Sequence, residues 1–214
     1  MKKILVTSFE PFGGEKVNPS QLAVAELPDE IDGAKIIKQV LPVVFDKSID
    51  ILYERLKQEK VEAVICVGQA GGRSEITVER VAININDAPI GDNVQNQPID
   101  QPIFPDGPTA YFSTLPIKTI VQKCNEIGIP TAISNTAGTF VCNHLMYGAC
   151  HYATLHQPTL KAGFVHIPFI PEQTVDKPHM PSMLKGDIVA GLVALIQTVI
   201  EVDQDVLITG GATH

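Results

Sequence analysis

One cysteine stands near the start of an expected helix, in a position that favours thiolate chemistry. Residues 134–139 (Ser-Asn-Thr-Ala-Gly-Thr) are small and turn-forming, and the apolar helical stretch after them holds Cys142 in its first turn. The unpaired N–H groups and the positive dipole end of a helix start stabilise a thiolate, which lowers the thiol pKa below its usual value of about 8.5. The pattern therefore predicts covalent catalysis by Cys142.

Two further residues supply the partners that a catalytic thiol needs. Glu79 lies in an apolar strand pattern and shares a face with apolar neighbours, so its carboxylate requires a partner, and a structural ion pair is the competing interpretation. His166 precedes Pro168, which ends a strand, so His166 is expected at a strand tip, although a lone strand histidine is more often structural. Together they predict a thiol hydrolase with Cys142 as nucleophile, His166 as base and then acid, and Glu79 orienting the imidazole.

The other cysteines and the nearby histidine fit structural roles better. Cys66 lies inside an apolar strand, whereas Cys124 and Cys150 lie within helices, away from a helix start. His144 is two residues from Cys142 on the same helix, so the two side chains do not face each other, and we expect His144 on the helix surface. The sequence has neither a Cys-x-x-Cys pair nor a His-Glu-x-x-His helix, so we expect no metal site.

Two loops after expected strands have ligand-binding features. Phe9 and Phe12 stand in a turn with two glycines, either as a hydrophobic plug or as a ligand-lining loop. Residues 68–73 (Gly-Gln-Ala-Gly-Gly-Arg) can cradle a phosphate, but no Walker lysine follows, and Gln69 can instead bind an amide-like substrate. Two other functions therefore stay open: a phosphorylase-type transferase, and a noncatalytic ligand-binding or thiol-sensing domain.

Composition and length narrow the class of protein. The chain has 214 residues and a formal net charge of −8 with scattered basic residues, so we expect one catalytic domain over residues 1–214 and no nucleic-acid partner. The longest apolar run, 188–200, is shorter than the roughly 20 residues that a membrane span needs, so no membrane partner is expected. The N-terminal apolar run is too short for an export signal, which favours a reducing cytoplasm with free thiols.

The elements that must position these residues alternate between strand and helix patterns. Strands are predicted at 3–8, 35–41, 61–67, 77–85, 131–134 and 163–167. Helices are predicted at 19–27, capped by Asn18, at 47–60, capped by Asp46, and at 117–127, 140–156 and 185–201. The order predicts an α/β fold whose mostly parallel sheet is covered on both faces, with an ordered excursion over the proline-rich residues 87–108.

Several segments resemble one known family. The quoted segments are Gly71-Gly72-Arg73, Ile76-x-x-Glu79-Arg80-Val81-Ala82-x-Asn84, the run from Ser134 to Asn143 and Gly163-Phe164-Val165-His166-Ile167-Pro168. They are similar to the signatures of pyroglutamyl peptidase I (pyrrolidone-carboxylate peptidase), and the similarity extends from Thr7 to Met183. The resemblance implies a cysteine peptidase that removes an N-terminal pyroglutamate, with its nucleophile, base and third member at Cys142, His166 and Glu79.

The same resemblance implies a three-layer α/β/α sandwich with a mixed, mostly parallel sheet. It also implies a cytoplasmic enzyme, commonly a homotetramer, that needs no cofactor and binds peptides with an N-terminal pyroglutamate. The Phe12 and Phe140 positions then line the pocket for the lactam ring, and we add Phe9 as a wall and Gln69 as an amide or oxyanion contact. Ordinary N-termini are expected to be rejected, because a charged α-ammonium group would be buried there without a partner.

Overall fold

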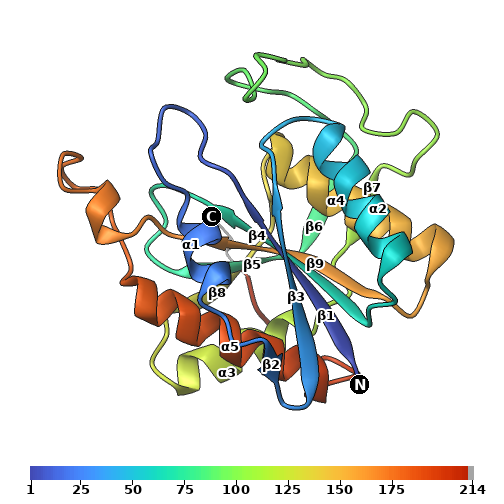
Figure 1. The fold of residues 1–214 in the computed structure, drawn as a ribbon, viewed down its shortest axis with the longest axis vertical. Helices are drawn as coiled ribbons and strands as arrows, with labels where there is room; N and C mark the ends of the chain where they lie inside the picture. Colours follow the sequence, from blue (N-terminus) through green and yellow to red (C-terminus); the bar gives the residue numbers. More distant parts are fainter. Residues whose placement is uncertain (212–214) are drawn as a thin grey trace.

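Seven strands form one central sheet in the computed structural model of the protein, which describes residues 1–211 (Figure 1). Across the sheet the strands are β2 (Glu30–Ile31), β3 (Ala34–Leu41), β1 (Lys3–Phe9), β4 (Ala63–Gln69), β9 (Lys161–Ile167), β5 (Ile76–Glu79) and β8 (Thr131–Ser134). Strands β3, β1, β4 and β9 are mutually parallel, whereas β5 is antiparallel to β9 and β2 is antiparallel to β3. The predicted mixed, mostly parallel sheet is confirmed.

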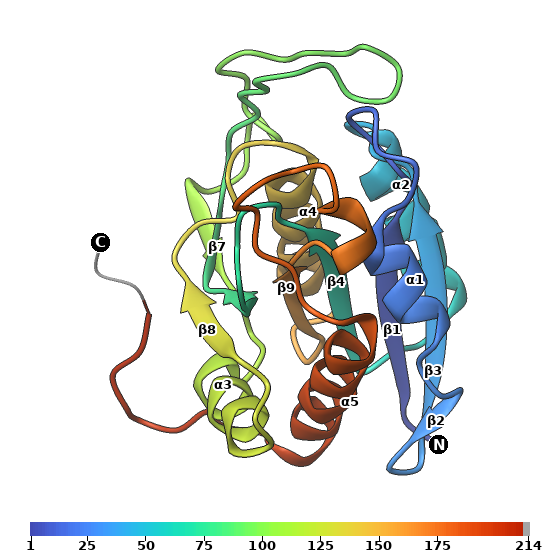
Figure 2. The same cartoon turned by 90° about the vertical axis from the view of Figure 1, so that its left-hand side faces the viewer.

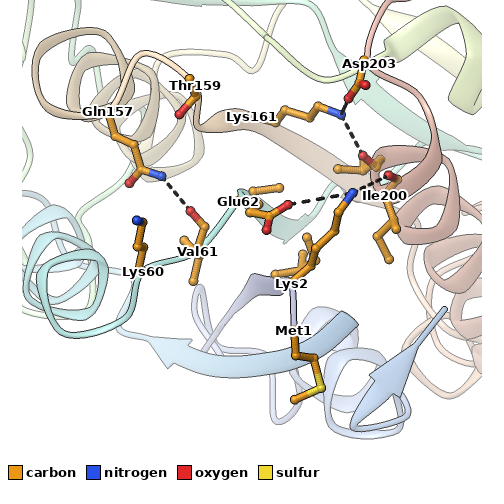
Figure 3. Close-up of a pocket in the computed structure, with 13 residues that line it drawn as sticks. Met1, Lys2, Lys60, Val61, Glu62, Gln157, Thr159, Lys161, Ile200 and Asp203 are labelled. Carbon is orange, nitrogen blue, oxygen red and sulfur yellow. Dashed lines mark hydrogen bonds and ion pairs between the residues drawn. The ribbon is translucent and has the colours of Figure 1, made fainter. Parts of the chain in front are cut away.

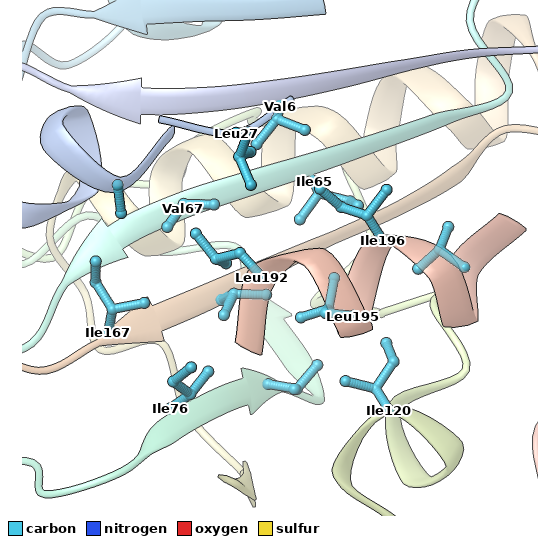
Figure 4. Close-up of a cluster of buried hydrophobic side chains, with 14 of the residues drawn as sticks. Val6, Leu27, Ile65, Val67, Ile76, Ile120, Ile167, Leu192, Leu195 and Ile196 are labelled. Carbon is cyan, nitrogen blue, oxygen red and sulfur yellow. The ribbon is translucent and has the colours of Figure 1, made fainter. Parts of the chain in front are cut away.

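Helices cover both faces of the sheet, which gives the predicted three layers (Figures 1 and 2). One face is covered by α1 (Pro19–Ala25), α3 (Ile117–Glu126) and α5 (Lys185–Glu201), and the other by α2 (Lys47–Gln58) and α4 (Val141–His156). The side chains of β4 alternate between the two apolar layers: Ile65 and Val67 pack towards α5, as Figure 4 shows, and Val64 and Cys66 towards α4. Burial on both faces explains why the strand is apolar throughout.

The strand predicted at 77–85 is wrong as a single element. The chain leaves the main sheet at Arg80, whose N–H donates to Ser134 O at 2.8 Å. The following β6 (Val81–Ile83) then pairs with β7 (Ala110–Phe112) in a separate two-stranded sheet. Strand propensity continues through Arg80, so the sequence pattern did not reveal that the chain changes its pairing strand there. Strands β2 and β7 were not predicted, because they are too short to show an alternation of apolar and polar residues.

The remaining boundaries differ from the predictions by a few residues. Helix α1 ends at Ala25, and Asn18 caps it as predicted, accepting a hydrogen bond from Ser20 N at 3.0 Å. Asp46 is at the N-cap of α2, but its side chain makes no capping hydrogen bond. Residues 87–108 form the predicted excursion, drawn in green above α4 in Figure 1, without a helix or a strand of their own. None of the helices in the described part of the chain is long and apolar enough to cross a membrane.

Candidate active site

Glu79 and His166 meet on the face of the sheet that α4 covers. The antiparallel register of β5 and β9 sets Thr77 opposite His166, so Glu79, two residues on, projects from the same face. Glu79 Oε1 accepts a hydrogen bond from His166 Nδ1 at 2.7 Å, and both side chains are buried. An ionised carboxylate only accepts hydrogen bonds, so Nδ1 carries the proton and the Nε2 lone pair of neutral His166 is free to take another.

Cys142 reaches the same place from the first turn of α4. The parallel register of β4 and β9 pairs Gly68 with His166. The Sγ atom of Cys142 lies 3.2 Å from the position that a Cβ atom on residue 68 would occupy. The thiol and the imidazole therefore lie over the same pair of residues on adjacent strands, and the three predicted catalytic residues converge.

We expect Gly68→Ala to impair catalysis more than folding. The added methyl group would lie 2.7 Å from Phe164 Cζ and 3.2 Å from Cys142 Sγ, so the ring or the thiol has to move. A displacement of the order of 1 Å at a nucleophile costs about 100-fold in rate. Turnover and the thermal midpoint should be measured together: a rate within about twofold of wild type would contradict the expectation.

Arg73 joins the site although the sequence reasoning treated it only as the end of a glycine-rich loop. Its Nη1 atom lies 2.7 Å from Glu79 Oε1 and also donates to Thr77 Oγ1. Glu79 therefore has both of the partners that its sequence context left open, an ion pair with an arginine and a hydrogen bond from His166. The sequence could have indicated this ion pair, because Arg73 lies only six residues before Glu79, a carboxylate that needed a partner.

The surroundings shift the pKa values of the pair in the directions that base catalysis needs. Burial opposes ionisation of Glu79, but the hydrogen bond and charge of His166, assisted by Ser134 and Arg73, lower its pKa below the usual value. Burial lowers the pKa of His166, against the opposing effect of Glu79. At neutral pH the site therefore holds an ionised Glu79 and a neutral His166.

The thiol pKa shifts in the opposite direction to the one we expected from the helix start. Burial raises the pKa of Cys142 to about 12, the Glu79 carboxylate adds to the rise, and Arg73 opposes it. Desolvation outweighs the helix start because a charge buried beside a carboxylate loses more hydration than the dipole returns. The free protein therefore holds a neutral thiol, and a reaction through the thiolate needs a base to accept its proton.

An aromatic pocket adjoins the thiol. Its lining residues, which include the four predicted pocket residues, are Phe9, Phe12, Asn18, Val43, Gln69, Phe140, Val141 and Cys142. The enclosed space is only about 10 Å³, which is too small for a substrate ring. Phe12 is partly exposed and is followed by Gly13 and Gly14, whose φ angles of 61° and 82° lie in the left-handed region that glycine adopts without strain. The structure brings the predicted residues together, and their role in substrate binding stays a prediction.

Comparison with known proteins assigns the family. The family model described as pyroglutamyl peptidase matches residues 2–202. The chain belongs to the pyroglutamyl peptidase family. It is 57% identical to the pyrrolidone-carboxylate peptidase of Alkaliphilus oremlandii, over 98% of this chain and 99% of the relative, and 53% identical to that of Finegoldia magna, over 99% and 100%.

Solved structures agree with the pyroglutamyl peptidase assignment. The crystal structure of pyroglutamyl peptidase I from Bacillus amyloliquefaciens matches with a TM-score of 0.94 and 47% identity, over 97% of this chain and 99% of that chain. A mutant pyrrolidone carboxyl peptidase from Pyrococcus furiosus matches with a TM-score of 0.90 and 44% identity, over 93% and 98%. The family and fold predicted from the sequence are confirmed.

His144 is buried, so its predicted surface position in this pyroglutamyl peptidase is wrong. Nδ1 of His144 lies 3.0 Å from Asn86 Oδ1, and Nε2 accepts a hydrogen bond from Asp46 N at 2.9 Å. The ring also packs edge-on against Phe45, which packs edge-on against the pocket residue Phe140. The chain just before α2 and just before the 87–108 excursion covers this side of α4, which the helix sequence alone did not indicate.

We expect His144 to make the protein less stable in mild acid. Burial lowers its pKa from 6.5 to about 4, and protonation of Nε2 would break the bond from Asp46 N. The unfolded chain therefore binds the proton first, so stability is complete above about pH 6.5 and falls as the pH drops towards 4. Between pH 7 and pH 5 the free energy of unfolding should fall by about 2 kcal/mol from His144 alone.

Urea unfolding of wild type and His144→Gln at both pH values measures this effect. His166 is also buried with a lowered pKa and contributes to both proteins, so the difference between them isolates His144. The same acid-induced loss in both proteins would contradict the assignment.

A second cavity lies away from the catalytic residues. It has a volume of about 430 Å³, and its lining residues Met1, Glu62 and Lys161 lie at the N-terminal ends of β1, β4 and β9 (Figure 3). The aromatic pocket is lined by Phe9 and Gln69, at the opposite ends of β1 and β4. Two of the three lysines that line the second cavity have partners: Lys2 faces Glu62, and Lys161 donates to Val202 O at 2.7 Å. The lining of this cavity includes neither cysteine nor histidine, so it offers neither a thiol nor an imidazole base. Across the described residues, no group of three or more His, Cys, Asp or Glu side chains is arranged to hold a metal ion.

Proposed function

We propose that the protein hydrolyses the amide bond after an N-terminal pyroglutamyl residue, with Cys142, His166 and Glu79 as its catalytic residues. The observation that carries the proposal is the 2.7 Å hydrogen bond between Glu79 Oε1 and His166 Nδ1, beside the thiol of Cys142. Pyroglutamyl peptidases are cysteine peptidases, and the family match covers all three residues.

In the first step Cys142 Sγ attacks the carbonyl carbon of the scissile amide while its proton passes to His166 Nε2. The developing oxyanion lies near the first turn of α4, whose N-cap is Phe140, a residue with no side-chain acceptor. The N–H groups of that turn stay available, and one such donor contributes about 3 kcal/mol to the transition state. The C–N bond then breaks, His166 returns the proton to the leaving amine, and a thioester remains on Cys142.

In the second step water replaces the amine. Neutral His166 takes a proton from the water as its oxygen attacks the thioester carbonyl, and then returns that proton to the departing thiolate. Free pyroglutamate leaves and the thiol is restored. Glu79 holds the tautomer and stabilises the imidazolium of both steps, while Arg73 keeps Glu79 ionised.

The pocket accounts for selectivity towards a neutral lactam. Phe12 and Phe140 pack with ring centroids 6.2 Å apart and planes tilted by 35°, so these two apolar walls have to separate for the lactam ring to enter between them. The lining supplies amide side chains but no carboxylate, so a charged α-ammonium group would be buried unpaired, at a cost of several kcal/mol.

The decisive experiment compares release of a fluorescent amine from a pyroglutamyl amide and from the matching prolyl amide. Proline has the same five-membered ring but carries a charged amine in place of the lactam. We expect turnover of the pyroglutamyl amide alone, and equal cleavage of the two would overturn the proposed specificity. The same assay with and without phosphate tests the phosphorylase alternative, against which Arg73 argues, because its guanidinium is committed to Glu79.

We also propose that the chain works as one catalytic domain, in the cytoplasm, as a homotetramer. Two apolar layers on either side of one sheet support a single domain. Exposed apolar side chains on the 87–108 excursion, Ile90, Val94 and Ile99, support an interface there. Sedimentation equilibrium tests the assembly: a mass of one chain at micromolar concentration would contradict it.

A further inference from the structure

Gln173 is a buried polar residue whose contacts lead to the pocket. It ends the short helical turn η1 (Pro171–Gln173), which follows β9 and lies beside the loop after β1, drawn in orange and blue in Figure 2. Its side chain is 5% exposed, so each of its amide atoms needs a partner.

The partners fix which way round the Gln173 amide lies. Its Oε1 atom accepts a hydrogen bond from the backbone N–H of Ile170 at 3.2 Å. Its Nε2 atom has only acceptors around it: Glu15 Oε2 at 3.3 Å, Val17 O at 3.5 Å and Gln69 Oε1 at 3.0 Å. The partners of fixed type settle the orientation whichever way Gln69 lies: a flipped amide would set its oxygen against the Glu15 carboxylate and Val17 O, and its NH₂ group against the Ile170 N–H.

The orientation of Gln173 decides that of Gln69. Because Gln173 offers a donor, Gln69 must turn its oxygen towards it, and the Nε2 amide group of Gln69 is then the group left for the pocket. Gln69 lines that pocket together with Cys142 and Phe140. Gln69 therefore presents a hydrogen-bond donor to a ligand in the pocket. A glutamine without such an anchor could rotate its amide and present either its NH₂ group or its oxygen.

We propose that Gln173 is a positioning residue that holds Gln69 as a hydrogen-bond donor to a carbonyl oxygen of the bound pyroglutamyl group. The inference rests on the proposed function, because it takes pyroglutamate as the occupant of the pocket. Gln173 also contacts Glu15, which pairs with Lys177 at 2.7 Å, so the same network joins the loop holding Phe12 to the segment after β9. A donor fixed in place favours the lactam and scissile carbonyls over a ligand that presents N–H groups.

The test is a double-mutant cycle on pyroglutamyl amide hydrolysis, using Gln173→Glu, Gln69→Leu and the two combined. Glu at 173 still accepts from Ile170 N–H but offers Gln69 an acceptor, which turns the Gln69 oxygen to the pocket. All four proteins are made in a Glu15→Gln background, so that the new carboxylate does not face Glu15. Circular dichroism melting follows folding, and Gln173→Met, which removes the donor without adding charge, replaces Gln173→Glu if that variant does not fold.

We expect Gln173→Glu to lower kcat/KM about tenfold when Gln69 is present and to change it less than about twofold when Gln69 is leucine. The kcat and KM values, determined separately, show whether the bond forms with the ground state or with the oxyanion. An equal loss in both backgrounds, or no loss in either, overturns the role of Gln173. Absence of hydrolysis by the parent protein would instead overturn the proposed function, so the two failures are distinguishable.

Discussion

Cys142→Ala is expected to abolish pyroglutamyl amide hydrolysis, with kcat/KM falling by at least about 10⁴-fold. The substitution removes the only atom that forms the covalent intermediate, and alanine keeps the Cβ atom at the start of α4 without adding a charge or a polar group. The fold should survive, because the start of α4 is anchored by Asn143, which exchanges hydrogen bonds with the backbone of Ile83 at 2.9 Å. Initial rates over a range of substrate concentrations measure the loss.

Cys66→Ser is the matched control. Cys66 lies two residues before Gly68 and is fully buried, so a substrate carbonyl does not reach its thiol. This variant loses some stability, because a hydroxyl group enters an apolar layer, but keeps its turnover at a temperature where it is folded. Mass spectrometry after iodoacetamide treatment should find the label on Cys142, the one partly exposed cysteine of the described residues. Residual activity in Cys142→Ala near the wild-type rate would remove Cys142 from the mechanism.

Glu79→Gln is expected to lower kcat/KM by about 10³- to 10⁴-fold. The amide has nearly the same shape, but it removes the charge that stabilises the imidazolium and can offer a donor to His166 Nδ1, which selects the wrong tautomer. It also leaves the Arg73 guanidinium, 2.7 Å from Oε1, without its carboxylate. That positive charge then opposes protonation of His166, in the direction in which Arg73 already acts on its pKa.

The pH profile separates this role from a structural one. With Glu79 absent, the acid limb of kcat/KM should move to lower pH, because the pKa of His166 loses the two contributions from Glu79 that raise it. Glu75→Gln, on the same segment but outside the Glu79–His166 contact, is the control and should leave both rate and profile unchanged. An unshifted acid limb in Glu79→Gln would mean that Glu79 does not act on His166.

The sequence by itself determined the layered fold, and it predicted the types of residue that we propose as catalytic. The signals are local: a thiol in a first helical turn, a proline ending the strand of His166, and a carboxylate among apolar strand residues in need of a partner. The helices at 117–127 and 185–201 were also found to within a residue, because their apolar period and their ends are encoded along a single stretch.

Only the tertiary structure decided which of these groups meet and what their charges are. Strand β5 pairs antiparallel with β9 and ends just before Arg80, so Glu79 lies beside His166. Strand propensity does not reveal such pairing, because the two strands are far apart in the chain. Arg73, Gln173 and the buried His144 gained their contacts in the same way. The raised pKa of Cys142 is likewise a consequence of packing: a helix start is visible in the sequence, whereas desolvation depends on the residues that the fold brings around the thiol.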